Sequence, residues 1–197
     1  MTIDLDLSFI LRIFAGSNKK NLIMKKIVLL IVVVLSSFSI TAPSTMDSDA
    51  EKYRIFYAEC MKVFELHELK NSMFSKDNLL RYLELKNAKN PTKILCQAVL
   101  ETGWFKSRSF TIGNNLFGMK YATRRQTTAT GKYLGHAKFN HWSDSVDDYL
   151  MWMQYWVDKG HKYKNHYAFL KRIGYAEDPL YNSKLAYIEK NHLNRLS

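Results

Sequence analysis

The sequence predicts a single, mainly helical domain with a small β-hairpin insertion. Apolar residues recur at the 3.6-residue period of an α-helix over most of the chain from Glu51 onward. The period disappears between Lys120 and Trp142, where threonines and two glycines, Gly131 and Gly135, are typical of a short antiparallel hairpin. The sequence has no internal repeats and no low-complexity tract, so a second domain is not expected.

The composition indicates a globular protein and leaves its partners open. Of the 197 residues, 47% are hydrophobic and 14% aromatic, which suffices for one well-packed domain. The net charge of +11 suits any polyanion, whether nucleic acid, anionic lipid or an acidic cell-wall polymer. A nucleic-acid partner is not expected, because the lysines are scattered and the pattern of residues 24–42 predicts export.

Residues 24–42 have the pattern of a secretory signal peptide. Met24 and two lysines form a positive start, Ile27–Leu35 is apolar, and Ser36–Ala42 is small and polar. The apolar run is short for a bilayer span, which favours a cleaved signal over the alternative of a membrane anchor. We therefore expect contact with a membrane only through this signal, and a mature chain in the periplasm, the cell envelope or outside the cell.

The signal peptide also divides the chain. Because such signals begin at the start of a protein, we expect residues 1–23 to be an upstream extension from a mis-assigned start. Residues 43–50 are small and polar and are expected to be a linker, which leaves 51–197 as the folded domain. Cys60 and Cys96 both lie on apolar helix stripes, so we expect free thiols, although export leaves a disulfide possible.

Six helices are expected in the order of the chain. The first three are Glu51–Lys70, a helix that is capped by Ser75 or Asp77 and runs to Lys86, and Pro91–Glu101, which Asn90 caps and Gly103 stops. The fourth runs from its cap Ser143 to Lys159, and the fifth is Tyr163–Ile173, which Gly174 ends. The last helix has Asp178 as its cap and Pro179 at its first position, with Tyr181, Leu185 and Ile188 inward.

The helix expected after residue 142 is amphipathic. Its tryptophans, Trp152 and Trp156, lie on one arc of the helical wheel. Asp144, Asp147 and Asp148 lie on the other arc, so these aspartates are expected to face solvent.

Glu101 is the acid that the helical pattern singles out. With Ile94 and Ala98 it falls at i, i+4 and i+7, so its carboxylate continues the apolar stripe of its helix. Burial and the negative end of the helix dipole both disfavour the charged form and raise the pKa, as a general acid near neutral pH requires. The alternative is a structural acid at a helix end, and the helix by itself favours that alternative.

The sequence does not indicate a metal or cofactor site. His136 and His141, like His161 and His166, are five residues apart, which is not the spacing of a helical metal site. There is no phosphate-binding glycine loop and no nucleophile elbow around a serine. We expect neither a metal nor an organic cofactor.

Four further motifs are ETGWF at 101–105, NNLFG at 114–118, FNHWSDS at 139–145 and GYAEDPLY at 174–181. In this order and spacing they resemble the glucosaminidase domain of peptidoglycan hydrolases, family 73 of the glycoside hydrolases. The resemblance covers about Glu51 to Arg195 and makes 51–197 the catalytic domain. It implies a lysozyme-like fold, with a helical lobe and a small β-hairpin lobe flanking a glycan cleft.

The resemblance also implies an activity and a set of site residues. Members hydrolyse the β-1,4 bond on the reducing side of N-acetylglucosamine, so we expect an exported endo-β-N-acetylglucosaminidase, monomeric, whose partner is the glycan strand of peptidoglycan. Glu101 would be the general acid, and Tyr175 would line the site and orient a water or the acetamido group. Trp104, Asn115 and Phe117 would bind substrate at the cleft floor. Alternatively, Asn115 holds backbone turns, and Trp104 and Phe117 belong to the core.

This chain departs from the family in its second carboxylate. Several relatives carry an acid in the hairpin, whereas the segment from Lys120 to Trp142 has none. Either the acetamido oxygen of the sugar attacks the anomeric carbon, or a base outside the hairpin drives inversion; we favour the first. Two other functions are compatible with the motifs: a muramidase or lytic transglycosylase with the same cleft, and a glycan-binding module without catalysis.

Overall fold

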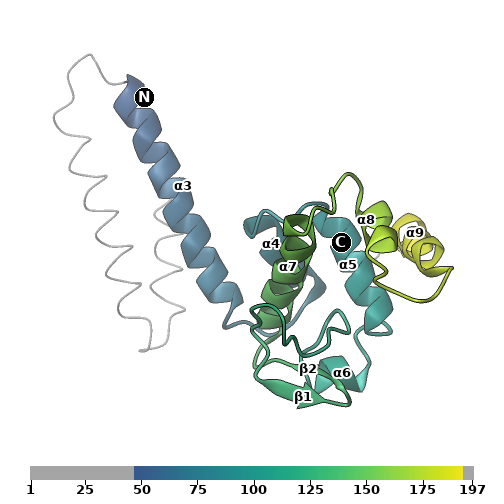
Figure 1. The fold of residues 1–197 in the computed structure, drawn as a ribbon. Coiled ribbons are helices and arrows are strands. Elements are labelled where there is room, and N and C mark those ends of the chain that lie inside the picture. The colour runs from purple at the N-terminus through teal and green to yellow at the C-terminus, as the bar shows by residue number, and fades with distance from the viewer. Residues whose placement is uncertain (1–46, 193–197) are drawn as a thin grey trace. The chain divides into compact units, whose positions relative to one another are not determined.

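The computed structural model describes residues 47–192 (Figure 1). The chain divides into two units between residues 65 and 66. In the first unit the described residues belong to α3 (Asp47–Leu69), which begins inside the segment expected to be a linker at 43–50. The expected upstream extension at 1–23 and the signal peptide at 24–42 lie outside the described residues.

The described part of the second unit contains the end of α3, six further helices and a two-stranded sheet. In chain order the elements are α4 (Lys76–Leu85), α5 (Pro91–Glu101), α6 (Arg108–Thr111), β1 (Gly131–Tyr133), β2 (His136–Lys138), α7 (Trp142–Asp158), α8 (His166–Arg172) and α9 (Tyr181–His192). The predicted fold class is confirmed: the chain is mainly helical, with the small antiparallel hairpin of a lysozyme-like fold. No helix within residues 47–192 is long and apolar enough to cross a membrane.

The central element of the second unit is α5. Its side chains from Ile94 to Val99 are all buried, so the helix is enclosed on every side. It packs against α4 and α9, and its C-terminal end points towards the hairpin and α6 (Figure 1). Cys96 is one of these buried residues and is a free thiol. Cys60 on α3 is a partly buried free thiol.

The predicted hairpin is confirmed, with strands of three residues each. β1 and β2 pair antiparallel. The two residues between them, Leu134 and Gly135, both have positive φ, 48° and 76°, as a type I′ turn requires. The N–H of Ala137 on β2 donates to the carbonyl of Met119 at 2.8 Å, so the hairpin is fastened to the turn that ends the NNLFG motif.

Two predicted helix caps are wrong. Asn90 is at the N-cap position of α5, but its backbone is left-handed (φ 59°) and its side chain makes no cap. The amide instead donates to the hydroxyl of Tyr163 at 3.1 Å. Ser143 lies inside α7, and the cap is His141, whose side chain accepts from the N–H of Ser143 and whose N–H donates to the Asp144 carboxylate. This reciprocal pair satisfies two helix-end donors, so the cap and the start of the helix both lie two residues earlier than predicted.

The last two helices start later than the pattern predicts. Asn165 caps α8, so that helix begins at His166 and not at Tyr163. Helix α9 begins at Tyr181, and Asp178 caps the preceding turn by accepting from the backbone N–H two residues later, at 2.8 Å. In contrast, the predicted cap of α4 by residue 75 is confirmed.

The prediction that Asp147 and Asp148 face solvent is wrong. Asp148 is fully buried, and its carboxylate accepts two hydrogen bonds from the Arg125 guanidinium, at 3.0 and 2.8 Å, and one from Thr127 at 2.5 Å. Asp147 lies 2.8 Å from the ammonium of Lys86. Both acids lie on the polar arc of α7, but segments distant in the chain cover that arc and supply the opposite charges.

Replacing Asp148 with alanine should lower the free energy of unfolding by about 3–5 kcal/mol, because it leaves a buried guanidinium without its partner. The Arg125 side chain is only 9% exposed, so water cannot replace the carboxylate. Chemical denaturation of the purified variant measures the loss. The matched control is Asp158→Ala, an exposed acid on the same helix, for which a change within about 0.5 kcal/mol is expected. Equal losses in the two variants would contradict the burial of this ion pair.

Candidate active site

Glu101 is the last residue of α5. The predicted stripe is confirmed, because Ile94 and Ala98 are fully buried and Glu101 is half-buried where the stripe reaches the helix end. The helix stops where Gly103 adopts a φ of 54°, which its missing side chain allows. The hydroxyl of Thr102 donates to the carbonyl of Ala98 at 2.6 Å and closes the last turn. The acid is therefore carried by a rigid, buried helix.

The two carboxylate oxygens of Glu101 have different neighbours. Tyr181, the first residue of α9, donates its hydroxyl hydrogen to Oε1 at 2.5 Å. Oε2 faces Gly118, where a Cβ would lie 3.1 Å from it. Gly118 also has a φ of 62°, so both its backbone and the space beside it favour glycine. One oxygen is thus held by a phenol, and the other lies beside a backbone that bears no side chain.

Burial raises the pKa of Glu101, as the sequence predicts, and the hydrogen bond from Tyr181 acts in the opposite direction by stabilising the carboxylate. The effect of burial is the larger, so the carboxyl group keeps its proton to a higher pH than an exposed glutamate does. Burial, then Tyr175 and the charge of Glu101, also raise the pKa of Tyr181 far above its ordinary value. Glu101 is therefore the member of this pair that gains and loses a proton, while Tyr181 keeps its hydroxyl hydrogen.

Tyr175 lies beside this pair and bonds to the backbone. Its ring centroid is 5.6 Å from that of Tyr181, and its hydroxyl donates to the carbonyl of Phe117. From the hairpin, Nδ1 of His136 donates to the carbonyl of Gly118 at 3.0 Å. The turn that faces Glu101 is therefore held by the segment before α9 on one side and by β2 on the other.

Of the three residues predicted to bind substrate, two are buried. Asn115 is 1% exposed; its Nδ2 donates to the carbonyls of Met119 and Ala137, at 2.9 and 2.8 Å. Its Oδ1 accepts from the N–H groups of Phe117 and Met119, at 3.3 and 3.0 Å. These bonds support the alternative in which Asn115 holds backbone turns. Phe117 is 1% exposed and stacks on Tyr149 with centroids 4.2 Å apart, which supports its alternative place in the core.

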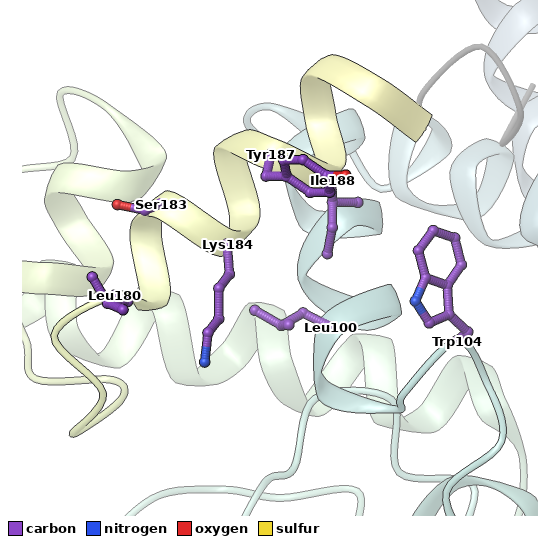
Figure 2. A pocket seen from close by; sticks show the side chains of 7 residues that line it. All are labelled: Leu100, Trp104, Leu180, Ser183, Lys184, Tyr187 and Ile188. Atoms are coloured by element: carbon purple, nitrogen blue, oxygen red, sulfur yellow. The ribbon is translucent and has the colours of Figure 1, made fainter.

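Trp104 is the third of these residues, and 45% of its surface is exposed. It forms one wall of a pocket of about 390 Å³ between the end of α5 and α9 (Figure 2). The pocket is lined by Leu100, Trp104, Leu180, Ser183, Lys184, Tyr187 and Ile188. Glu101 is not a lining residue, so the pocket adjoins the acid without containing it.

Two of the histidines in the described part of the chain have structural partners. His141 caps α7, and Nε2 of the fully buried His166 lies 3.0 Å from Oε1 of Gln97. Burial lowers the pKa of His166 to about 4, so its ring is neutral at neutral pH. Within residues 47–192 there is no group of three or more His, Cys, Asp or Glu side chains that could hold a metal ion.

Tyr181 is the site residue that sequence analysis misses. The pattern assigns it correctly to the inward face of the last helix, where it is 9% exposed. Periodicity says nothing of its hydroxyl, however. A signal is present all the same, because a buried tyrosine needs a hydrogen-bond partner and Glu101 is a half-buried acid that needs a donor.

The fold and the site together define a class of protein: a lysozyme-like helical lobe in which a central helix ends on one half-buried acid, beside a small β-hairpin. Residues 78–193 match the family model Glucosaminidase, described as mannosyl-glycoprotein endo-beta-N-acetylglucosaminidase. The chain therefore belongs to this glucosaminidase family, as its motifs predict. The match includes Glu101, Gly118, Tyr175 and Tyr181.

A more specific similarity is to Protein bax of Escherichia coli (strain K12), which is 39% identical over 61 residues. These residues are 30% of this chain and 22% of the length of Protein bax, so the chain spans well under two thirds of that relative. No solved structure matches the chain.

Replacing Tyr181 with phenylalanine should raise the pKa of Glu101 further, because it removes the hydrogen bond that favours the carboxylate and keeps the ring that buries it. An NMR titration of the Glu101 carboxyl carbon in both proteins measures the change. Tyr167→Phe is the matched control, since that hydroxyl bonds to Glu189 at 2.6 Å and should leave Glu101 unaffected. A pKa of Glu101 that stays the same or falls in Tyr181→Phe would contradict the assigned role of the phenol.

Proposed function

We propose that this chain is a peptidoglycan hydrolase, an endo-β-N-acetylglucosaminidase that cleaves the β-1,4 bond after N-acetylglucosamine with Glu101 as the general acid. The observation that carries the proposal is the Glu101–Tyr181 pair: a half-buried carboxyl group with a raised pKa, held by one oxygen and open to a side-chain-free turn at the other. Membership of the glucosaminidase family supports the substrate class, a glycan that contains N-acetylglucosamine.

The two oxygens of Glu101 take different parts in the proton transfer. Tyr181 donates to Oε1, so the transferable proton is carried by Oε2, the oxygen beside Gly118. This proton moves to the glycosidic oxygen while positive charge develops on the sugar. The carboxylate left behind keeps its hydrogen bond from Tyr181, which stabilises the newly formed charge. Tyr181 thus acts through Glu101 as a positioning residue.

The reaction also needs a nucleophile at the anomeric carbon, and we infer that the substrate supplies it. The hairpin segment contains no acid. The acids that follow it have other partners, since the Asp144 carboxylate accepts from the N–H of His141 at the start of α7, and Asp147 and Asp148 are held in ion pairs. The acetamido oxygen of the sugar would attack the anomeric carbon, and water would then open the cyclic intermediate and return a proton to Glu101.

Tyr175 fits a supporting role in this step. Its hydroxyl hydrogen is donated to the carbonyl of Phe117, so towards a substrate the phenol oxygen can only accept a hydrogen bond. An acceptor suits the N–H of an acetamido group, whose oxygen is then turned towards the anomeric carbon. We infer that Tyr175 orients this group and also holds the turn beside Glu101.

We further infer that the chain is exported. The support is the sequence of residues 24–42, with its two lysines, apolar run and small polar end. Export would bring the chain to the compartment that contains peptidoglycan. Residues 1–42 carry five basic and two acidic residues, so the remaining chain keeps +8 of the net charge of +11, which suits the acidic groups of that polymer.

The Glu101→Gln protein should lose wall-lytic activity by about 10²- to 10⁴-fold, the usual contribution of a general acid. Release of reducing ends from purified peptidoglycan measures the rate, and mass spectrometry of the wild-type products identifies the bond. N-acetylglucosamine at the reducing end is expected, whereas an anhydromuramic end would indicate a lytic transglycosylase. Glu84→Gln, an exposed acid on α4, is the matched control and should keep full activity.

The same variant should fold normally. A pKa raised in the folded state means that stability falls as pH rises above the unfolded value of about 4.3 and Glu101 ionises. Glutamine removes this penalty, so Glu101→Gln should be no less stable than the wild type at neutral pH. Retained activity in a stable Glu101→Gln protein, or glycan binding by the wild type without turnover, would refute the proposed function.

The stereochemistry of the product tests substrate assistance separately. Attack by the acetamido oxygen followed by attack of water inverts the anomeric carbon twice, so net retention is expected. ¹H NMR of the freshly released anomer, recorded before mutarotation, decides the point. Net inversion would exclude substrate assistance and require a base from outside the hairpin.

A further inference from the structure

Two residues that line the pocket between α5 and α9 are chain neighbours of Glu101 and Tyr181. Leu100 lines the pocket and is the neighbour of Glu101 in the chain, and Leu180 lines it and precedes Tyr181. Consecutive Cα atoms are about 3.8 Å apart, so one peptide unit separates the pocket wall from each member of the pair. A substrate whose scissile bond lies at Glu101 would therefore bring its neighbouring substituents within reach of this pocket.

The turn that carries Trp104 into the pocket wall has an unfavourable backbone. Gly103, Trp104 and Phe105 all have left-handed conformations, with φ of 54°, 61° and 63°. For a bulky residue this region is a true outlier, and only glycine adopts it freely. Thr102 holds the turn, since its Oγ1 accepts from the N–H of Phe105 at 2.8 Å. The backbone N–H of Trp104 donates to the carbonyl of Val99 at 2.9 Å, and the turn leaves the ring 45% exposed, at the wall of the pocket.

The chemistry of the lining is apolar with one cation. Leu180 and Tyr187 are 61% and 62% exposed, and both line the pocket together with Trp104. Lys184 is the only charged lining residue. Its ammonium lies 2.5 Å from the Asp178 carboxylate in a pair that is half exposed, so hydrogens of the ammonium face solvent and can bind a second anion.

A lining of this kind suits a short acidic peptide better than a sugar ring. A sugar presents hydroxyl groups around its edge, and burying them against carbon without hydrogen-bond partners is unfavourable. Small aliphatic side chains can instead pack on the apolar wall, while a free carboxylate reaches Lys184. In peptidoglycan, short peptides with alanine methyl groups and free carboxylates hang from the glycan strand.

We propose that the pocket formed by Leu100, Trp104, Leu180, Lys184 and Tyr187 binds the peptide attached to the glycan strand, with Lys184 paired to one of its carboxylates. This inference rests on the proposed function, since it assumes that the strand lies at Glu101. The chain would then prefer strands that still carry their peptides over bare glycan.

The test compares two glycan fragments of equal length, one with its peptides and one from which an amidase has removed them. Binding is measured by calorimetry on the Glu101→Gln protein, which leaves the fragments intact. We expect the peptide-bearing fragment to bind about tenfold more tightly, the size of a charge-assisted hydrogen bond at a partly exposed site. Adding Lys184→Gln should remove most of this preference and leave affinity for the bare glycan unchanged. Lys190→Gln, an exposed lysine on the same helix, is the matched control and should keep the preference.

Equal affinity for the two fragments, or an equal loss for both in Lys184→Gln, would overturn the inference. If the inference is correct, Ser183→Trp, which fills the pocket without changing its charge, also abolishes the preference for the peptide-bearing fragment. Hydrolysis without peptide preference supports the proposed function and refutes the pocket. Peptide preference in a wild type that hydrolyses neither strand refutes the function and supports the pocket. Failure to bind either fragment refutes both.

Discussion

The hydrogen bond from Tyr181 to Glu101 is the contact on which the site depends, because it joins the start of the last helix to the end of the central one. Burial alone raises the pKa of Glu101 and leaves the carboxylate, once formed, poorly solvated. The phenol supplies that carboxylate with a strong hydrogen bond and keeps its own proton, since its pKa is raised as well. Burial therefore raises the pKa of Glu101, so the carboxyl group keeps its proton to a higher pH than an exposed glutamate does, and the phenol stabilises the carboxylate that forms when the proton leaves.

The turn opposite the acid is organised around a position without a side chain. A methyl group at Gly118 would lie 3.1 Å from Oε2, the oxygen that is proposed to carry the transferable proton. Three side chains from different segments hold this turn: Asn115 from within, Tyr175 through the carbonyl of residue 117, and His136 through the carbonyl of residue 118. These polar side chains hydrogen-bond to the backbone of the turn, and no side chain of Gly118 occupies the space beside Glu101. The NNLFG motif thus acts on the site mainly through its backbone.

Periodicity predicts α5, α7 and α9, because burial of one helix face leaves a local repeat in the sequence, and it places Glu101 on the buried stripe for the same reason. It fails where a partner is distant in the chain. Asp148 lies on the polar arc of its helix, yet Arg125, 23 residues earlier, covers it. Tyr181 meets Glu101 across 80 residues. The wrong prediction of a side-chain cap at Asn90 has a local cause, because the left-handed backbone of this residue turns its side chain away from the helix end. A helical wheel shows neither the partners that are distant in the chain nor the backbone conformation before the helix.

The end of α5 also links acid strength to the shape of the neighbouring pocket. Thr102 donates to Ala98 in the last helical turn and accepts from the N–H of Phe105 in the left-handed turn, so one buried hydroxyl joins the two conformations. Helix α9 contacts both, through Tyr181 at the acid and through its pocket-lining side chains beside Trp104. If α9 undocked, Glu101 would lose the donor that stabilises its carboxylate, and the pocket would lose a wall. In the proposed mechanism, proton transfer from Glu101 and recognition in the pocket would therefore depend on the same helix junction.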